Sequence, residues 1–179
     1  EPMAAAIGSG LPVDQPMGSM VVDIGGGTTE VAVLSKFAVA LCESLRIAGD
    51  EANEAVRDHI RKTHRIGISE NMAEVVKIKI GTAVPPSKPL SLKLRGKDIS
   101  TGLPRVVTIT DEEIREAIRE PTQAVVEAVR RTLERASPDL AADIAENGIW
   151  LAGGGALLKG LGTLVQEVTG LPVRFSEDP

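Results

Sequence analysis

Residues 20–34 read Met-Val-Val-Asp-Ile-Gly-Gly-Gly-Thr-Thr-Glu-Val-Ala-Val-Leu, and this stretch decides the fold. An apolar run ends at Asp23, glycines and threonines turn the chain, and a second β-branched run leaves. The pattern predicts a hairpin with its tip at Gly25, Gly26, Gly27 and Thr28. Glycines there can adopt positive φ and point N–H groups at an anion, and Asp23 can hold a hydrated divalent cation beside it. The stretch predicts a phosphate and magnesium site, although a hairpin that merely turns would use the same residues.

Two common nucleotide signatures do not match. The pattern G-x-G-x-x-G would need a glycine at Glu30. A P-loop would need Gly-x-x-x-x-Gly-Lys-Ser/Thr. Gly155 and Gly160 have the required glycine spacing, but Leu161 stands where the lysine should be. The sequence therefore favours neither a Rossmann enzyme nor a P-loop NTPase.

Composition limits the class of protein. The 179 residues suit one ordinary domain or two small lobes, and 42% hydrophobic with 25% charged residues fits a soluble globular protein. Aromatic residues make up only 2%, so the core must consist of Val, Ile, Leu and Ala. A net charge of −5 argues against a nucleic-acid partner. No apolar run reaches the ~20 residues of a membrane span.

The lone Cys42 is expected to be a buried core residue, and His59 and His64 to be surface residues.

The order of predicted elements indicates an α/β fold, a sheet flanked by helices with an inserted subdomain. Three antiparallel strands come first, a helical insertion with a small sheet follows, and the chain ends helix-strand-helix-strand. A capping box at Thr110 and Glu113 opens one helix, which Pro121 should interrupt. The predicted strands are 19–24, 29–34, 37–47, 91–94, 106–109, 149–152 and 173–175, and the predicted helices include 51–65, 70–80, 122–136 and 156–169.

A second glycine cluster lies at 153–155, where a buried strand runs into a helix. Ligands of open α/β sheets bind beyond the carboxyl ends of strands, and both Asp23 and Ala152 occupy such ends. Glu74 and Lys77 lie three residues apart on an inserted helix. Their spacing alone indicates a solvated ion pair.

Together these residues resemble the superfamily of actin, heat-shock chaperone and sugar-kinase ATPases, and more narrowly the MreB family of bacterial actin homologues. The resemblance rests on Glu1-Pro-Met-Ala-Ala-Ala-Ile-Gly, Val22-Asp-Ile-Gly-Gly-Gly-Thr-Thr-Glu, Arg46-Ile-Ala-Gly-Asp, Ser100-Thr-Gly-Leu-Pro-Arg and Leu151-Ala-Gly-Gly-Gly-Ala-Leu-Leu. It implies a ribonuclease H-like lobe with a mixed sheet. Residues 1–12 would be a connecting helix, 13–49 and 120–179 the core of the second lobe, and 50–119 its small inserted α+β subdomain.

The resemblance also implies roles for individual residues, with ATP or ADP and Mg²⁺ as cofactors. Glu1 and Thr28 would position the attacking water, and Asp23 would lie near magnesium. The turn from Gly25 to Thr28 would face the phosphates. The nucleoside would contact Gly49, Glu74, Lys77, Gly153, Gly154, Gly155, Ala156 and Leu157, which reverses the interpretation of Glu74 and Lys77 as a surface pair.

The family pattern also includes a first lobe with its own phosphate loop and a later connecting helix, and neither matches this sequence. Nucleotide in the family sits between two lobes, so this chain alone is expected to fold without hydrolysing ATP. The implied function of the whole protein is that of a filament-forming cytoskeletal ATPase in cell shape and cell-wall synthesis. It would assemble with itself, act with the cell-wall machinery, and lie in the cytoplasm at the inner face of the membrane. Two alternatives stay open: a non-polymerising chaperone-type or regulatory ATPase, and a purely interacting role in which residues 50–119 form the partner face.

Overall fold

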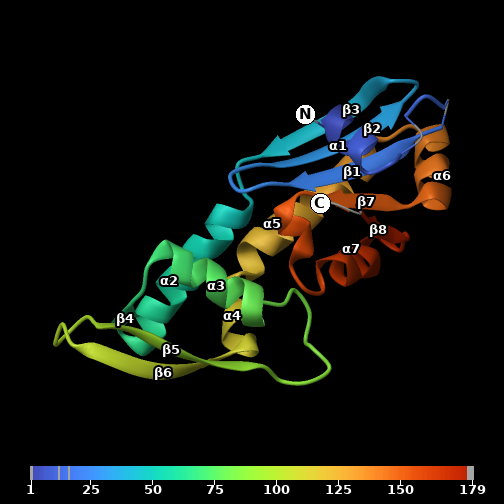
Figure 1. Ribbon diagram of the computed structural model, residues 1–179. Coiled ribbons are helices and arrows are strands. Elements are labelled where there is room, and N and C mark those ends of the chain that lie inside the picture. The colour runs from blue at the N-terminus through green and yellow to red at the C-terminus, as the bar shows by residue number, and fades with distance from the viewer. Residues whose placement is uncertain (1, 12, 16, 177–179) are drawn as a thin grey trace.

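The computed structural model describes residues 2–11, 13–15 and 17–176, and within them the strands form two sheets (Figure 1). The larger sheet has five strands in the order β3-β2-β1-β7-β8, and the smaller one has three in the order β4-β5-β6. The strands are β1 (Ser19–Ile24), β2 (Thr29–Ser35), β3 (Ala38–Leu45), β4 (Ile66–Gly67), β5 (Ser91–Asp98), β6 (Pro104–Thr110), β7 (Ile149–Ala152) and β8 (Val173–Phe175).

The larger sheet is mixed, which confirms the predicted class. β1, β2 and β3 form the antiparallel meander, whereas β7 and β8 run parallel to β1. Across the pair β1 and β7, Asp23 is the partner of Ala152. This register brings both glycine clusters to the same edge of the sheet, because each cluster directly follows one of these strands.

Alternation along β1 separates the two faces of this sheet. Met20, Val22 and Ile24 belong to a core that also includes residues of α5 (Arg119–Arg135) and α7 (Leu161–Thr169). Val21 belongs to a smaller core beneath α1 (Pro2–Gly8). Because both faces are covered, β1 is apolar at nearly every position, as expected for a central strand.

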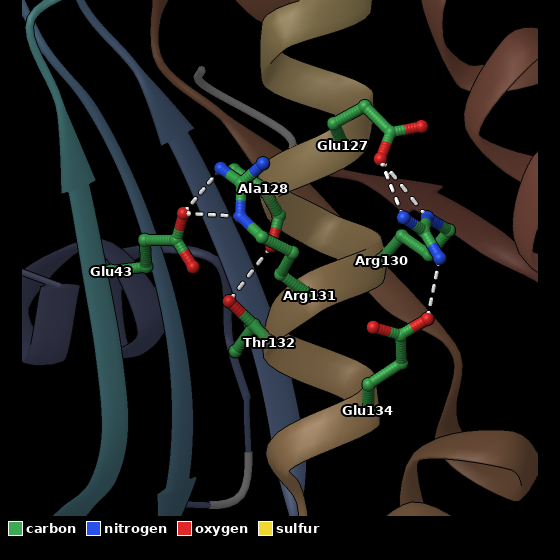
Figure 2. Close-up of polar contacts among 7 residues, drawn as sticks. All are labelled: Glu43, Glu127, Ala128, Arg130, Arg131, Thr132 and Glu134. Atoms are coloured by element: carbon green, nitrogen blue, oxygen red, sulfur yellow. Dashed lines mark hydrogen bonds and ion pairs between the residues drawn. The ribbon is translucent and has the colours of Figure 1, made fainter.

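Helix α5 crosses the meander, and polar contacts hold it to the edge strand β3 (Figure 2). Arg131 donates to the Glu43 carboxylate from both Nε and Nη2. Thr132 is fully buried and its hydroxyl donates to the carbonyl of Ala128 at 2.9 Å. On the solvent side Arg130 pairs with the carboxylates of Glu127 and Glu134. Exposed pairs of this kind contribute little, so apolar burial is the main force that fixes α5.

The smaller sheet has a core of its own, formed with α2 (Gly49–His64), α3 (Glu70–Ile80) and α4 (Asp111–Ala117). Figure 1 shows α2 leaving the larger sheet toward the smaller one and α5 returning. The predicted capping box is confirmed, since Thr110 accepts from the N–H of Glu113 and the Glu113 carboxylate accepts from the N–H of Thr110. β5 and β6 extend beyond the predicted ranges, because their ends form an exposed hairpin without strong strand residues.

Two helix boundaries differ from the prediction. The break before α5 lies at Ile118, and Pro121 sits in the first turn of α5, where its missing N–H has no partner to lose. The segment after β7 is a 3₁₀ turn, η1 (Gly154–Leu157), separated from α7 by Gly160 at φ 77°. The remaining helix, α6 (Pro138–Asn147), is capped by Ser137. None of the helices in the described part of the chain has both the length and the apolar character needed to cross a membrane.

Two predictions about single residues were wrong. Cys42 is exposed, because it lies on the edge strand β3, where residues alternate toward solvent. Partial desolvation of the thiol and the nearby Glu30 carboxylate raise the pKa of Cys42. His64 is half-buried, and its Nε2 lies 2.7 Å from Oε1 of Glu113. Its contact joins the end of α2 to the start of α4, which spacing along the chain could not indicate.

The turn between β2 and β3 is strained. Its two residues, Lys36 and Phe37, have φ of 50° and 57°. Paired positive φ values match the twist of a two-residue hairpin, but the turn normally uses Asn and Gly. The Phe37 side chain is 65% exposed, so packing compensates little of the strain.

We expect Phe37→Gly to raise the free energy of unfolding by about 1 kcal/mol, because glycine has no Cβ to clash in the left-handed region. Urea denaturation of the 179-residue chain measures this. Phe37→Ala is the matched control, since alanine removes the same exposed ring and keeps the strain. Equal stability of the two variants would show that the backbone at residue 37 is not strained.

Candidate functional site

A pocket lies where helices packed on the two sheets meet the first glycine turn. Its volume of about 450 Å³ is typical of sites for small molecules. Its walls come from the turn between β1 and β2, from α2 and α3, from the start of α5, and from η1 with the loop that follows. The structure therefore brings together segments that lie far apart in the sequence. The predicted site residues that line it are Gly25, Gly26, Gly49, Glu74, Lys77, Gly154, Gly155 and Leu157.

Other predicted site residues lie outside the lining. Gly27 and Thr28 are exposed at the tip of the turn, and Gly153 and Ala156 pack behind the pocket wall. Asp23 is half-buried at the end of β1, next to the pocket-lining Ile24. Glu1 lies outside the described residues, so its predicted role stays a prediction.

The glycine turn is joined to α2 by the backbone. The N–H of Gly49 donates to the carbonyl of Gly25 at 3.1 Å, and the N–H of Asp50 donates to the carbonyl of Gly26 at 2.8 Å. Gly25 closes the turn by donating to the carbonyl of Thr28. The start of α2 is thereby held against the turn, and both face the pocket.

The expected positive φ values in this turn are wrong, because none of its three glycines has one. Close approach explains two of the glycines better. A Cβ on Gly26 would lie 3.3 Å from the Asp50 carboxylate, and one on Gly49 would lie 3.2 Å from the carbonyl of Gly25. The absence of side chains thus allows α2 to begin directly against the turn.

Lys77 points to the pocket and not to open solvent. Its Nζ donates to the carbonyl of Gly49 at 3.0 Å, which links α3 to the start of α2. Burial lowers the pKa of the Lys77 ammonium, and the carboxylates of Glu74 and Asp50 act in the opposite direction. A half-buried cation beside a glycine turn and flanked by two acids can serve a polar ligand that carries both hydroxyl and anionic groups.

The second cluster contains glycines of two kinds. A Cβ on Gly153 or Gly155 would collide with the end of β1, at Ile24 in both cases, so these two glycines are required for packing. Gly154 is exposed, and a Cβ on it would meet nothing within 4 Å. Gly154 therefore borders open space in the pocket, as a residue close to a ligand should.

Two carboxylates flank the glycine turn on neighbouring strands. Asp23 and Glu30 are directly opposed in the antiparallel pair of β1 and β2, so both side chains leave the same face. Oε2 of Glu30 is buried without a hydrogen-bond partner. Among the described residues no group of three or more His, Cys, Asp or Glu side chains is arranged to hold a metal. A hydrated Mg²⁺ that also binds phosphates needs only one or two protein carboxylates, so this pair fits that ion.

Sequence reasoning missed several residues of the pocket. Asp50 and Asn53 follow Gly49 on α2, and Pro121 and Val125 come from α5. Asp50 could have been identified from the sequence, because it belongs to the stretch Arg46-Ile-Ala-Gly-Asp that resembles the family. Nothing in the local sequence marks Asn53 or the residues of α5, because they enter the pocket only through the packing of α2 on α5.

Comparisons with known proteins identify the family of this chain. The family model described as MreB/Mbl protein matches residues 1–179. The chain is 49% identical over its whole length to the cell shape-determining protein MreB of Escherichia coli (strain K12) and 42% identical to the cell shape-determining protein Mbl of Bacillus subtilis (strain 168). It covers 52% and 54% of those proteins, so the chain spans about half the length of the curated relatives it matches.

Solved structures show the same fold. The crystal structure of Spiroplasma citri MreB5 bound to AMPPNP superposes with a TM-score of 0.93 at 34% identity, and the match covers 98% of this chain and 53% of that one. A MamK double helical filament superposes with a TM-score of 0.81 at 22% identity, covering 99% and 54%. The fold is that of the actin-like proteins, and the chain belongs to the MreB/Mbl family.

Proposed function

We propose that this chain binds an adenine nucleotide in the pocket and serves an actin-like, filament-forming protein of cell shape. One observation carries the proposal. The glycine turn, the second glycine cluster through Gly154 and Gly155, and the pair Glu74 and Lys77, which the family resemblance assigns to the site, line a single pocket. The relatives support it, since MreB5 was crystallised with AMPPNP and with ADP, and MreB and Mbl are named as cell shape-determining.

The polarity of the pocket sets the orientation of the ligand. Phosphates would lie at Gly25 and Gly26, where the backbone is free of side chains. Glu74 and Lys77 would contact the ribose. The base would fill the apolar end, against Gly154 and Leu157 from the second cluster and Val125 from α5.

The magnesium ion would sit beside the phosphates, near Asp23 and Glu30. When bound, it would neutralise phosphate charge. Thr28 at the tip of the turn, together with Glu1, would orient water for hydrolysis in the whole protein. For hydrolysis we propose that a second lobe is needed, because the family resemblance implies that nucleotide sits between two lobes.

The division at residues 12, 49 and 119 is part of the proposal. The separate cores of the two sheets support a core subdomain and an inserted one. We further propose self-assembly into filaments, with the cell-wall machinery and the inner face of the membrane as partners of the whole protein. The filament of MamK supports assembly at the level of the fold. A chaperone-type or regulatory ATPase of the same superfamily would bind nucleotide without polymerising.

Two measurements on the complete gene product that contains this chain test the proposal. Isothermal titration should give saturable binding of ATP and ADP at one site, because the described pocket is a single cavity. Negative-stain microscopy with ATP should show filaments. Binding without filaments would support the regulatory alternative, and no binding of either nucleotide would overturn the assignment of the pocket.

A further inference from the structure

Asn53 is a buried amide at the pocket. It lies on α2, one helical turn beyond Gly49, and only 5% of the residue is exposed. It lines the pocket together with residues from the start of α2 and from α5. A helical turn rises about 5.4 Å, so Asn53 lies about this distance along α2 from Gly49, which contacts the glycine turn.

The amide oxygen of Asn53 has no hydrogen-bond partner. Within the described residues, only this Oδ1 and Oε2 of Glu30 are buried side-chain atoms in that state. Other buried polar side chains are satisfied: the Thr29 hydroxyl donates to the carbonyl of Ile47, and the Thr132 hydroxyl to that of Ala128. An unpaired buried acceptor costs about 1–3 kcal/mol, so a native protein that keeps one at a pocket has a reason for it.

The surroundings of Asn53 decide which part of a nucleotide it can meet. Asp50 and Lys77 lie at the glycine turn and the start of α2, since they donate to the carbonyls of Gly26 and Gly49, and we assign this region to the phosphates and ribose. Other residues of the lining, such as Ala52 and Pro121, offer no side-chain hydrogen bond. The unpaired atom is an acceptor, so it matches the amino group on the edge of a base and not a phosphate oxygen, which only accepts.

We propose that Asn53 is a binding residue for the base, whose amide oxygen accepts a hydrogen bond from the 6-amino group of adenine. This inference rests on the proposed nucleotide function. In this inference Asn53 recognises the base, whereas the backbone and the charged groups hold the phosphates and the ribose. The unpaired oxygen is then satisfied in the bound state, and a ligand without the amino group leaves it unpaired.

The test combines a change in the protein with a change in the ligand. Dissociation constants are measured by titration for ATP and for purine riboside triphosphate, which lacks the 6-amino group, on the complete gene product. Wild type should bind ATP about tenfold more tightly than the analogue, the worth of one such hydrogen bond. Asn53→Leu, which keeps the size and removes the polarity, should bind both ligands equally.

Controls separate base reading from a structural role. Asn147→Leu removes an amide outside the pocket, one that donates to the carbonyl of Gly18, and should keep the tenfold ratio. Replacing ATP by 2′-deoxyATP should raise the dissociation constant by the same factor in wild type and in Asn53→Leu, because other residues hold the ribose. Asn53→Ala provides the same comparison if Asn53→Leu does not fold.

The outcomes are distinct. A ratio that falls from about tenfold to about one in the Asn53 variants supports the inference. The inference would be overturned if wild type bound the two ligands equally or if the ratio were unchanged in the variants. It would also be overturned if the Asn53 variants changed the effect of the 2′-hydroxyl and not that of the 6-amino group. Each of these outcomes would leave nucleotide binding intact. Wild-type protein that binds none of these ligands would overturn the proposed function and the inference together.

Discussion

Gly154→Val is expected to raise the dissociation constant for ATP about 100-fold and to leave the unfolding midpoint within about 2 °C of wild type. The two effects separate because a Cβ at residue 154 meets nothing within 4 Å. The side chain therefore fits the folded protein, but it occupies the space we assign to the adenosine. Titration with ATP and thermal denaturation of the complete gene product measure the two quantities.

Gly67→Val is the matched control for this substitution. Gly67 lies on β4 in the smaller sheet. A Cβ added there would lie 3.8 Å from its nearest neighbour, the carbonyl oxygen of Lys97, so valine fits there as well. Its affinity for ATP should equal that of wild type. If Gly154→Val also bound ATP normally, the second glycine cluster would be a packing turn only.

Gly153→Ala should have the opposite signature, a loss of about 3 kcal/mol in the free energy of unfolding. Gly153 has φ 79° and ψ 160°, a combination that only glycine adopts readily. An added Cβ would also meet the carbonyl of Ile24 and lie 2.5 Å from the Asp23 carboxylate. Neither β1 nor the loop can move away easily, because Asp23 and Ala152 are paired in the sheet.

Chemical denaturation of the 179-residue chain tests this second prediction, with Gly154→Ala as the neighbouring control. The control should lose less than about 1 kcal/mol, since its Cβ meets open space and its backbone is not strained. Similar stability of the two variants would mean that the end of β1 yields to the side chain. The adjacent glycines would then share one role.

The sheet could be predicted because its signals are local. β-Branched runs around Asp23 and Val31 form buried strands, and glycines end them, so the meander and β7 lie where the sequence places them. The break at Gly160 could not be predicted. It depends on Val84, which packs against residue 160 from a loop after α3, and on Ala83, whose N–H donates to the carbonyl of Lys159.

The candidate site was predictable to a similar degree. Glycine clusters marked two walls of the pocket, but the place of Lys77 depends on its bond to the carbonyl of Gly49, 28 residues away. Spacing on a helix reports only neighbours on that helix, so spacing alone predicts a surface ion pair for Glu74 and Lys77. Asn53 had no signal, since an unpaired amide is a property of the packed structure.

A crystal structure of the complete gene product with AMPPNP tests the central claim most directly. We predict phosphates against the backbone of Gly25 and Gly26. The base should lie against Gly154, Leu157 and Val125, within reach of Asn53. Nucleotide bound elsewhere, with this pocket closed by side chains, would contradict the account.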